Sequence, residues 1–183
     1  MKKGATLLAI LSVLLLNSGQ AQKFYTKTGK ISFFSEASLE NIEAHNRSVT
    51  AVLDSQTGDL QFSVLMKGFE FKKALMQEHF NDKYMESDKY PKAEFKGQVV
   101  NNSEIIYSTD GSYPAKVNGQ ITIHGQTKPI ETSGKIVVKS GKPVLLSSFN
   151  LVVADYNITI PRMYTDNISK TIKVTVEAPL TAL

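Results

Sequence analysis

Three histidines are the residues from which metal or acid–base chemistry would first be expected. Glu43 lies two residues before His45, and Glu78 and Asp82 lie close to His79. A structural zinc site usually shows two ligands at a short fixed spacing, such as HxxxH or a cysteine pair. The sequence has neither pattern and contains no cysteine. We therefore expect no metal site and no cofactor.

Serines and carboxylates are present, but no catalytic motif contains them. The sequence has no G-x-S-x-G turn, no phosphate-binding loop and no cysteine nucleophile. The carboxylates of Glu78, Asp82, Glu86 and Asp88 follow the polar face and the end of a predicted helix. These residues therefore give no positive indication of an enzyme. An exported hydrolase or isomerase that modifies a lipid is the alternative, and a perturbed carboxylate or histidine pointing into a cavity would favour it.

A short helix is predicted near residues 70–84, inside a chain that otherwise alternates like a sheet. Leu75, Met76, His79, Phe80 and Tyr84 have the spacing of one helical face, and the opposite face is polar. The apolar face predicts either the wall or lid of a ligand cavity, or a plug that packs as ordinary core. Methionine adapts to a partner without a fixed shape, which favours the cavity.

The elements around this helix are predicted to be strands with one solvated face. Alternating runs include 60–66, 117–123, 149–153 and 172–176, and turn residues separate the strands at Gln56-Thr57-Gly58, Asp110-Gly111, His124-Gly125, Ser133-Gly134 and Ser140-Gly141. We count about eight antiparallel strands. Periodicity alone does not distinguish a sandwich from a barrel, although the mixture of large and small inward residues favours a closed barrel. Residues 38–47 fit either a helical turn or a bulged strand.

The N-terminus has the pattern of an export signal. Lys2 and Lys3 precede an apolar run of about 12 residues, shorter than the roughly 20 of a membrane span, and small residues follow at Gly19 and Ala21. We expect a signal peptide at 1–21, one exported domain at 22–183 that is periplasmic or secreted, and no stable membrane span.

Basic residues are dispersed and only two are arginine, so no nucleic-acid partner is expected. Whether two chains pair as a homodimer stays open.

Three separated motifs resemble the YceI-like family. The first is FEFKKALMQEHFNDKYMESDKYPKAEFKG, in which His79-Phe80, Tyr90-Pro91 and Phe95 match the family pattern; the second is the VNGQITIHGQTK hairpin at 117–128; the third is SFNLVVADYNITIP at 148–161. Ala154 stands where the family commonly has an arginine before Asp155, so no role is assigned to an arginine there. The resemblance implies an all-β fold, an extended eight-stranded antiparallel barrel of lipocalin-like shape.

The same resemblance implies an exported bacterial binding protein, not an enzyme, that holds a long isoprenoid or fatty amphiphile in an apolar interior. A structural envelope protein with a filled barrel is a further alternative, and a cavity of several hundred Å³ would separate the two. Lys72, Lys73 and Arg162 are candidates for neutralising a head group. The residues expected to line the cavity are Phe33, Phe62, Val64, Phe69, Phe71, Leu75, Met76, Phe80, Tyr84, Phe95, Ile121, Phe149 and Leu151.

Overall fold

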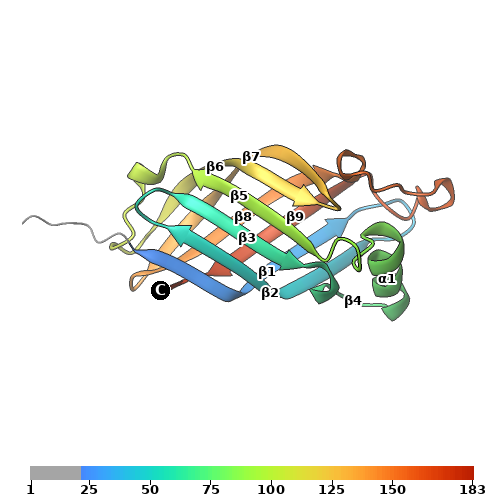
Figure 1. Ribbon diagram of the computed structural model, residues 1–183, viewed down its shortest axis with the longest axis horizontal. Coiled ribbons are helices and arrows are strands. Elements are labelled where there is room, and N and C mark those ends of the chain that lie inside the picture. The colour runs from blue at the N-terminus through green and yellow to red at the C-terminus, as the bar shows by residue number, and fades with distance from the viewer. Residues whose placement is uncertain (1–21) are drawn as a thin grey trace, which may run out of the picture.

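Eight antiparallel strands form a closed barrel in residues 22–183, the part of the chain that the computed structural model describes (Figure 1). The predicted signal peptide at 1–21 lies outside the described residues. Around the barrel the strands follow the order β1-β9-β8-β7-β6-β5-β3-β2, and pairing of β1 with β2 closes the ring. The predicted fold class is confirmed. The strands are β1 (Lys23–Ser35), β2 (Ile42–Asp54), β3 (Asp59–Leu65), β5 (Lys92–Val99), β6 (Gly111–Ile123), β7 (Gln126–Lys139), β8 (Lys142–Val152) and β9 (Thr171–Pro179).

Two hairpin turns set the register of the second half of the barrel. His124 and Gly125 connect β6 to β7 with φ of 51° and 72°, and Ser140 and Gly141 connect β7 to β8 with φ of 51° and 71°. Positive φ at both central residues is typical of type I′ turns, whose twist matches that of the flanking strands. These turns place alternate residues of all three strands inside the barrel.

The structure corrects one predicted turn, at residues 133–134, and resolves the open assignment of residues 38–47. Ser133-Gly134, predicted as a turn, lies inside β7, so that prediction was wrong. A Cβ on Gly134 would lie 2.3 Å from the carbonyl oxygen of Leu146, so this glycine allows the close approach of β8 and does not mark a turn. The open segment 38–47 becomes a loop followed by β2 from Ile42.

The helical segment is shorter and less regular than expected. Residues 70 and 71 form a two-residue strand, β4 (Glu70–Phe71), which pairs with β2. Only then does α1 (Ala74–His79) begin, and it continues as a single π-helical turn, η2 (Phe80–Tyr84). Backbone pairing with the barrel rim therefore replaces the first turn of the predicted helix. Other short elements are the 3₁₀ turns η1 (Met66–Gly68), η3 (Asn102–Glu104), η4 (Val153–Tyr156) and η5 (Arg162–Tyr164), and the strand β10 (Thr181–Ala182) beside β1.

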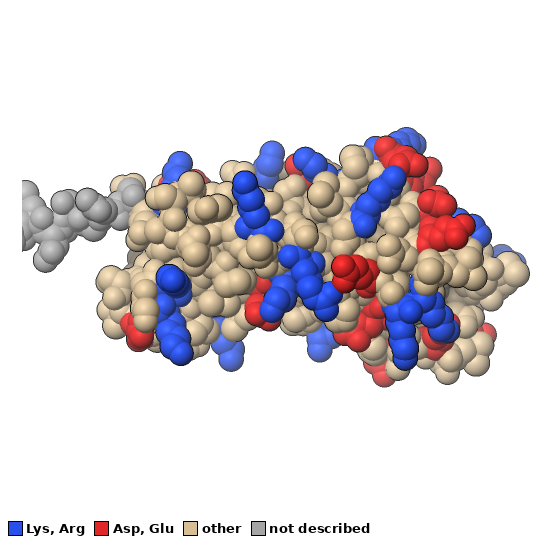
Figure 2. All heavy atoms as spheres, turned by 90° about the horizontal axis from the view of Figure 1, so that it is seen from below, with Lys and Arg blue, Asp and Glu red and all other residues tan. Residues whose placement is uncertain are grey.

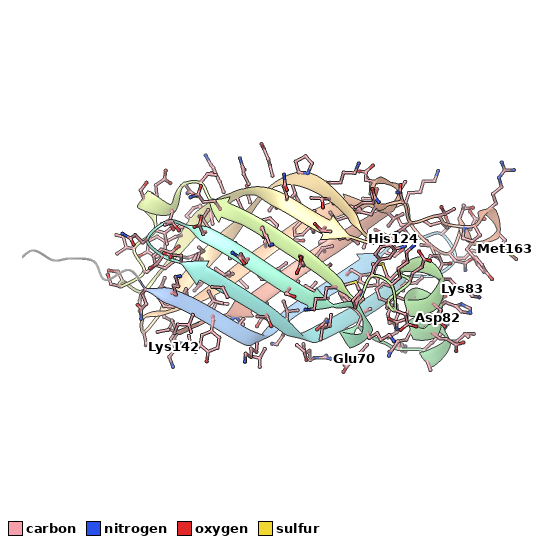
Figure 3. The ribbon with its side chains drawn as sticks, viewed as in Figure 1. Glu70, Asp82, Lys83, His124, Lys142 and Met163 are labelled. Carbon is pink, nitrogen blue, oxygen red and sulfur yellow. The ribbon has the colours of Figure 1, made fainter. Side chains whose placement is uncertain are left out.

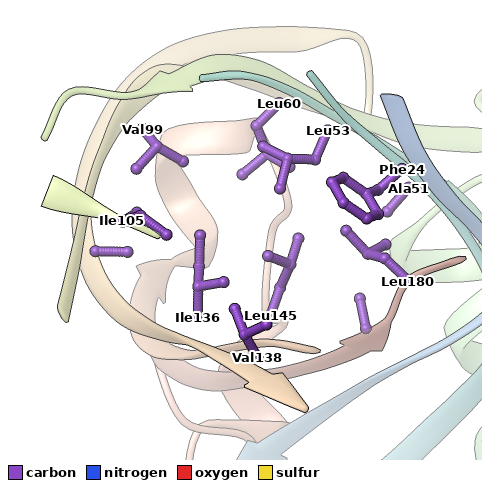
Figure 4. Packing of buried hydrophobic residues seen from close by; sticks show 12 residues of the cluster. Phe24, Ala51, Leu53, Leu60, Val99, Ile105, Ile136, Val138, Leu145 and Leu180 are labelled. Atoms are coloured by element: carbon purple, nitrogen blue, oxygen red, sulfur yellow. The ribbon is translucent and has the colours of Figure 1, made fainter. Parts of the chain in front are cut away.

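The two ends of the barrel are built differently. At the closed end, where the β2–β3 and β7–β8 turns lie, aliphatic side chains fill the interior (Figure 4). At the helix end, α1 and η2 lie across the barrel beside the β1–β2 and β8–β9 loops (Figure 1). The closed-end cluster consists of Phe24, Ala51, Leu53, Leu60, Val99, Ile105, Ala115, Ile136, Val138, Leu145, Ala178 and Leu180. The helix-end cluster consists of Ala44, Val49, Val64, Met66, Phe69 and Met85.

Candidate functional site

A cavity of about 450 Å³ lies inside the barrel between these two clusters. Inward-facing residues from all eight barrel strands line it, together with residues from α1 and η2, and its wall is almost wholly apolar. An eight-stranded barrel is about wide enough to enclose one small ligand, and the volume is within the usual range of about 300–1,000 Å³ for ligand sites. The interior therefore has space for a guest.

Midway along the wall, Phe95 is held flat by two glycines. Gly97 on β5 and Gly119 on β6 are directly paired, and an added Cβ on either would meet the Phe95 ring at 2.6 and 2.7 Å. The ring therefore occupies the space that two side chains would take. Its edge faces Phe62 with ring centroids 6.3 Å apart. Phe95 thus widens the cavity instead of crossing it.

Four phenylalanine rings form the apolar group beneath the helix. Phe80 of η2 lies 5.5 Å from Phe33, 5.6 Å from Phe69 and 5.0 Å from Phe71, measured between ring centroids. Phe33 also contacts Phe69 and Phe71 at 5.3 and 5.7 Å. Such pairs each contribute about 0.5–1.5 kcal/mol beyond the burial of area. The ring of Phe80 is therefore one of the side chains that attach the helical segment to the barrel.

Polar contacts join the segment after η2 to the β6–β7 hairpin. Nε2 of His124 lies 2.8 Å from Oε2 of Glu86, and Nδ1 lies 3.0 Å from the carbonyl oxygen of Tyr156. Carbonyl and carboxylate oxygens only accept hydrogen bonds, so both contacts are satisfied together when both ring nitrogens carry protons. The Tyr90 ring packs on the imidazole at 4.6 Å. His124 lies on the barrel rim (Figure 3). As a tether, it links the β6–β7 hairpin to the segment after η2 and to η4.

Two further ion pairs hold the helical segment to the rim. Nζ of Lys73 lies 2.5 Å from Oε1 of Glu40 in the β1–β2 loop, and Nζ of Lys67 lies 2.5 Å from Oδ1 of Asp88. The Asp88 pair is largely exposed, which weakens it. Glu40 itself lines the cavity, so the Lys73 pair marks the mouth between α1 and the β1–β2 loop.

Two tyrosines on the cavity wall stay neutral. Burial, and to a lesser degree the neighbouring Tyr164, raises the pKa of Tyr84. Burial, with a smaller effect of Asp155, raises the pKa of Tyr156. Neutral phenols add no charge to an apolar lining. Within residues 22–183 no group of three or more His, Cys, Asp or Glu side chains is arranged to hold a metal ion.

The structure places nearly all of the residues expected at the cavity on its wall. Leu75 is the exception and is corrected here: it is 61% exposed and points away from the cavity, because α1 begins only at Ala74 and turns its face toward Met76, His79 and Phe80. Whether the others bind a ligand stays a prediction. The expected residues on the wall are Phe33, Phe62, Val64, Phe69, Phe71, Met76, Phe80, Tyr84, Phe95, Ile121, Phe149 and Leu151.

The three candidate head-group residues lie on the outside of the helix end. Lys72 and Arg162 are exposed, and Lys73 is paired with Glu40 at the mouth. Their neighbourhood is not uniformly basic: Figure 2 shows acidic side chains mixed with the basic ones toward this end. A role for them in ligand binding stays a prediction.

Sequence reasoning missed part of the wall. Alternation could have identified Ile123, Ile136 and Val174, which share the inward parity of residues already named. Tyr164 and Asn167 in the β8–β9 loop could not be found this way, because that segment has no strand or helix period. The loop is positioned by tertiary contacts, such as the hydrogen bond from the Leu39 amide to the Asp166 carbonyl at 2.9 Å.

A family model described as the YceI-like domain matches residues 17–180. The chain therefore belongs to the YceI-like family. The resemblance stated from the three sequence motifs is confirmed, and the hairpin motif at 117–128 is the one that carries His124 to the rim. No curated protein matches the sequence.

Solved structures with the same fold are distant in sequence. A polyisoprenoid binding domain from Saccharophagus degradans, implicated in plant cell wall breakdown, is 14% identical with a TM-score of 0.77, and the alignment covers 90% of this chain and 100% of that one. BcnA from Burkholderia cenocepacia is 13% identical with a TM-score of 0.68, covering 84% and 96%. The Campylobacter jejuni YCEI protein is 16% identical with a TM-score of 0.60, covering 81% and 88%. At these identities the likeness is one of fold.

Proposed function

We propose that this protein binds the hydrocarbon chain of an isoprenoid or fatty amphiphile inside its barrel and carries or stores it. The observation that carries the proposal is the apolar cavity of about 450 Å³ inside the barrel. Burial of apolar surface contributes about 25 cal/mol per Å², so a chain that buries about 300 Å² would gain roughly 7 kcal/mol before the costs of association. The S. degradans polyisoprenoid binding domain, which shares the fold, supports this choice of ligand class.

The cavity also argues against the two alternatives. A structural barrel filled by its own side chains would leave no space of this size. A lipid-modifying enzyme would need a reactive group inside the cavity. His79, Glu40 and Glu94 lie on the lining; Glu40 is paired with Lys73 at the mouth, and among the described residues no hydrogen bond joins the side chain of His79 or of Glu94 to a nucleophile. Binding without chemistry is therefore the function that the site supports best.

Native mass spectrometry of the purified protein, followed by organic extraction, tests the proposal. We expect a bound amphiphile to co-purify, or an added prenyl alcohol or fatty acid to bind one per chain. Substituting Phe62→Asp places a charge inside the cavity and should abolish binding, because an isolated buried charge is costly. Gln61→Asp, on the outer face of the same strand, is the matched control. No bound lipid in either experiment would reject the proposal.

A charged head group would lie at the mouth, beside Lys72 and Lys73. Charge-assisted hydrogen bonds from lysine to phosphate or carboxylate oxygens are the contacts that such a head group needs. The pair Lys72→Ala and Lys73→Ala should weaken a prenyl diphosphate relative to the matching prenyl alcohol, and Arg162→Ala should do the same if η5 reaches the head group. Lys142→Ala, at the opposite end of the barrel (Figure 3), is the control. Equal loss for both ligands would remove the head-group role.

The protein is further proposed to be exported. The support is the pattern of Lys2, Lys3, the apolar run and Ala21 in the sequence. Among residues 22–183 no helix is long and apolar enough to cross a bilayer. N-terminal sequencing of the protein recovered from cells tests the proposal, and the expected first residue is Gln22. A chain that retains Met1 in the recovered protein would contradict it.

A further inference from the structure

We propose that the helix end of the barrel docks on the surface of a lipid bilayer, with three exposed apolar side chains inserted among the lipids around the mouth of the cavity. These side chains, called the tip residues below, are Leu39 in the β1–β2 loop, Leu75 on α1 and Met163 on η5. The proposal rests on the proposed function, because it makes the membrane surface the place where the lipid ligand enters and leaves the barrel.

The tip residues are among the most exposed large apolar side chains of residues 22–183. Leu39 is 73% exposed and Met163 is 77% exposed, and Leu75 points away from the cavity. Isolated apolar side chains are common on protein surfaces, so their placement, and not their exposure alone, is what indicates a partner. Three segments that are far apart in the sequence bring them to the helix end (Figure 1), and Met163 lies at its extreme (Figure 3).

The apolar wall of the cavity continues outward into the tip residues. Each tip residue directly precedes a residue that lines the cavity, namely Glu40, Met76 and Tyr164. The hydrogen bond between the Leu39 amide and the Asp166 carbonyl holds the β1–β2 and β8–β9 loops together at this end. A partner that covers the tip residues therefore meets the mouth as well. A bilayer is the apolar partner that also contains the proposed ligand, so a tail could pass between the two without crossing water.

Polar groups beside the tip residues match the head-group layer of a bilayer. Lys72 and Arg162 are exposed and form no ion pair among residues 22–183, and such long cationic side chains reach lipid phosphates while their neighbours insert. Tyr164 is exposed at the mouth, and tyrosine is enriched where hydrocarbon meets water. Glu78 and Asp82 on the helical segment offset these cations. Apolar insertion is therefore expected to supply most of the affinity, with a smaller contribution from anionic lipids.

Co-sedimentation of the purified protein with vesicles of mixed phosphatidylcholine and phosphatidylglycerol tests the docking. We expect the protein to bind, and the double variant Leu75→Asp with Met163→Asp should bind at least about tenfold more weakly, because each buried methylene group is worth about fourfold in affinity and a charge is costly in hydrocarbon. Ile106→Asp, at an exposed apolar residue beside the closed end, is the matched control and should bind like the wild type.

Two results of this experiment would overturn the proposal. One is a wild-type protein that stays in the supernatant, which would favour a protein partner for the helix end. The other is a double variant that binds the vesicles as tightly as the wild type does.

Single-site labelling tests which end of the barrel meets the bilayer. The chain contains no cysteine, so one introduced cysteine carries an environment-sensitive dye at a known position. With the dye on Met163→Cys or Leu39→Cys, vesicles should shift its emission to shorter wavelength, because the dye enters an apolar layer. The same dye on Ile106→Cys should not respond. An equal response at both ends, or a response at Ile106→Cys alone, would contradict docking through the helix end.

Binding and transfer of a fluorescent fatty acid separate this proposal from the proposed function. Without vesicles, the wild type and the Leu75→Asp, Met163→Asp double variant should bind the fatty acid equally, because both tip residues lie outside the cavity. Transfer from the wild type to vesicles should become faster in proportion to vesicle concentration, as in a collision, and should be slower for the double variant. A transfer rate independent of vesicle concentration would mean passage through water, which would overturn docking and leave ligand binding intact. Absence of fatty-acid binding in solution would instead reject the proposed function.

Discussion

The closed end and the helix end of the barrel are both covered by apolar side chains, but the types of side chain differ. At the closed end, aliphatic residues such as Leu53, with no exposed surface, pack between the paired strands of the barrel. At the helix end, rings and methionines such as Phe80 and Met85 come from a short helix and from loops. One end is closed by the sheet itself, and the other by a segment attached through a few side chains.

This difference separates stability from access. Strand pairing and aliphatic packing contribute to the folding of the whole barrel, because every strand depends on its neighbours. The helical segment pairs with the sheet only through β4 and can move without breaking the ring. Regions with few buried contacts open at lower free energy than the core. We therefore expect the helix end to be the route of ligand exchange.

The largest effect is expected at the closed end. Leu53→Ala should lower the free energy of unfolding by about 2–5 kcal/mol, because it removes a fully buried side chain and leaves a cavity. Leu75→Ala, the same deletion on the exposed face of α1, should change it by less than about 0.5 kcal/mol. Denaturant unfolding measures both. Similar losses for the two variants would break the distinction between the ends.

A smaller loss of stability with a larger effect on exchange is expected at Phe80. Phe80→Ala removes the ring that contacts Phe33, Phe69 and Phe71, and should cost about 1–3 kcal/mol, less than Leu53→Ala, because the ring borders an existing cavity. Ligand dissociation, followed by stopped-flow displacement, should become faster. Phe34→Ala, on the opposite parity of β1 from Phe33, is the control. An unchanged dissociation rate would argue against exchange at this end.

The tether at His124 should matter less. His124→Ala removes the contacts to Glu86 and to the Tyr156 carbonyl, and should lower the free energy of unfolding by about 1–2 kcal/mol while increasing hydrogen exchange in residues 80–90. His124→Asn, which can keep one donor, should have an intermediate effect. Hydrogen exchange that rises equally in β7 and β8 would show that the residue supports the barrel as a whole.

The smallest effect is expected at Tyr107 beneath the closed end. Its hydroxyl donates to Oδ1 of Asn102 at 2.7 Å, and Tyr107→Phe should cost about 1 kcal/mol at neutral pH. Burial raises the pKa of Tyr107 above its ordinary value of 10.0. The raised pKa favours the neutral hydroxyl in the folded chain, so its contribution is fully present below about pH 10 and is lost as the pH rises toward the raised value.

Unfolding measured from neutral to alkaline pH checks this prediction. The wild-type protein should lose stability above about pH 10 by more than Tyr107→Phe does, because the variant lacks the ionisable group. Tyr113→Phe, which removes a more exposed hydroxyl that donates to the Thr109 carbonyl, is the comparison variant. Parallel pH profiles for the wild type and Tyr107→Phe would contradict the assignment.

Most of the fold could be predicted because its signals are local. Alternation along residues 117–123 and the pair His124-Gly125 define a hairpin without reference to the rest of the chain. The glycine at 134 misled the turn prediction because its reason is the approach of β8, which is not encoded nearby. The start of α1 was placed too early for a similar reason: Glu70 and Phe71 were assigned to the helix, but they pair with Ala44 and His45 as a strand.

The sequence by itself indicated about eight antiparallel strands with one apolar face, since side-chain parity and turn chemistry are properties of neighbouring residues, and its three motifs indicated the family. Only the tertiary structure decided that the interior is hollow and that one end is sealed. Those properties depend on how Phe95 lies over Gly97 and Gly119, and on how far Leu145 and Ile136 reach across the barrel. Residues distant in the sequence set these distances together, so no local pattern reports them.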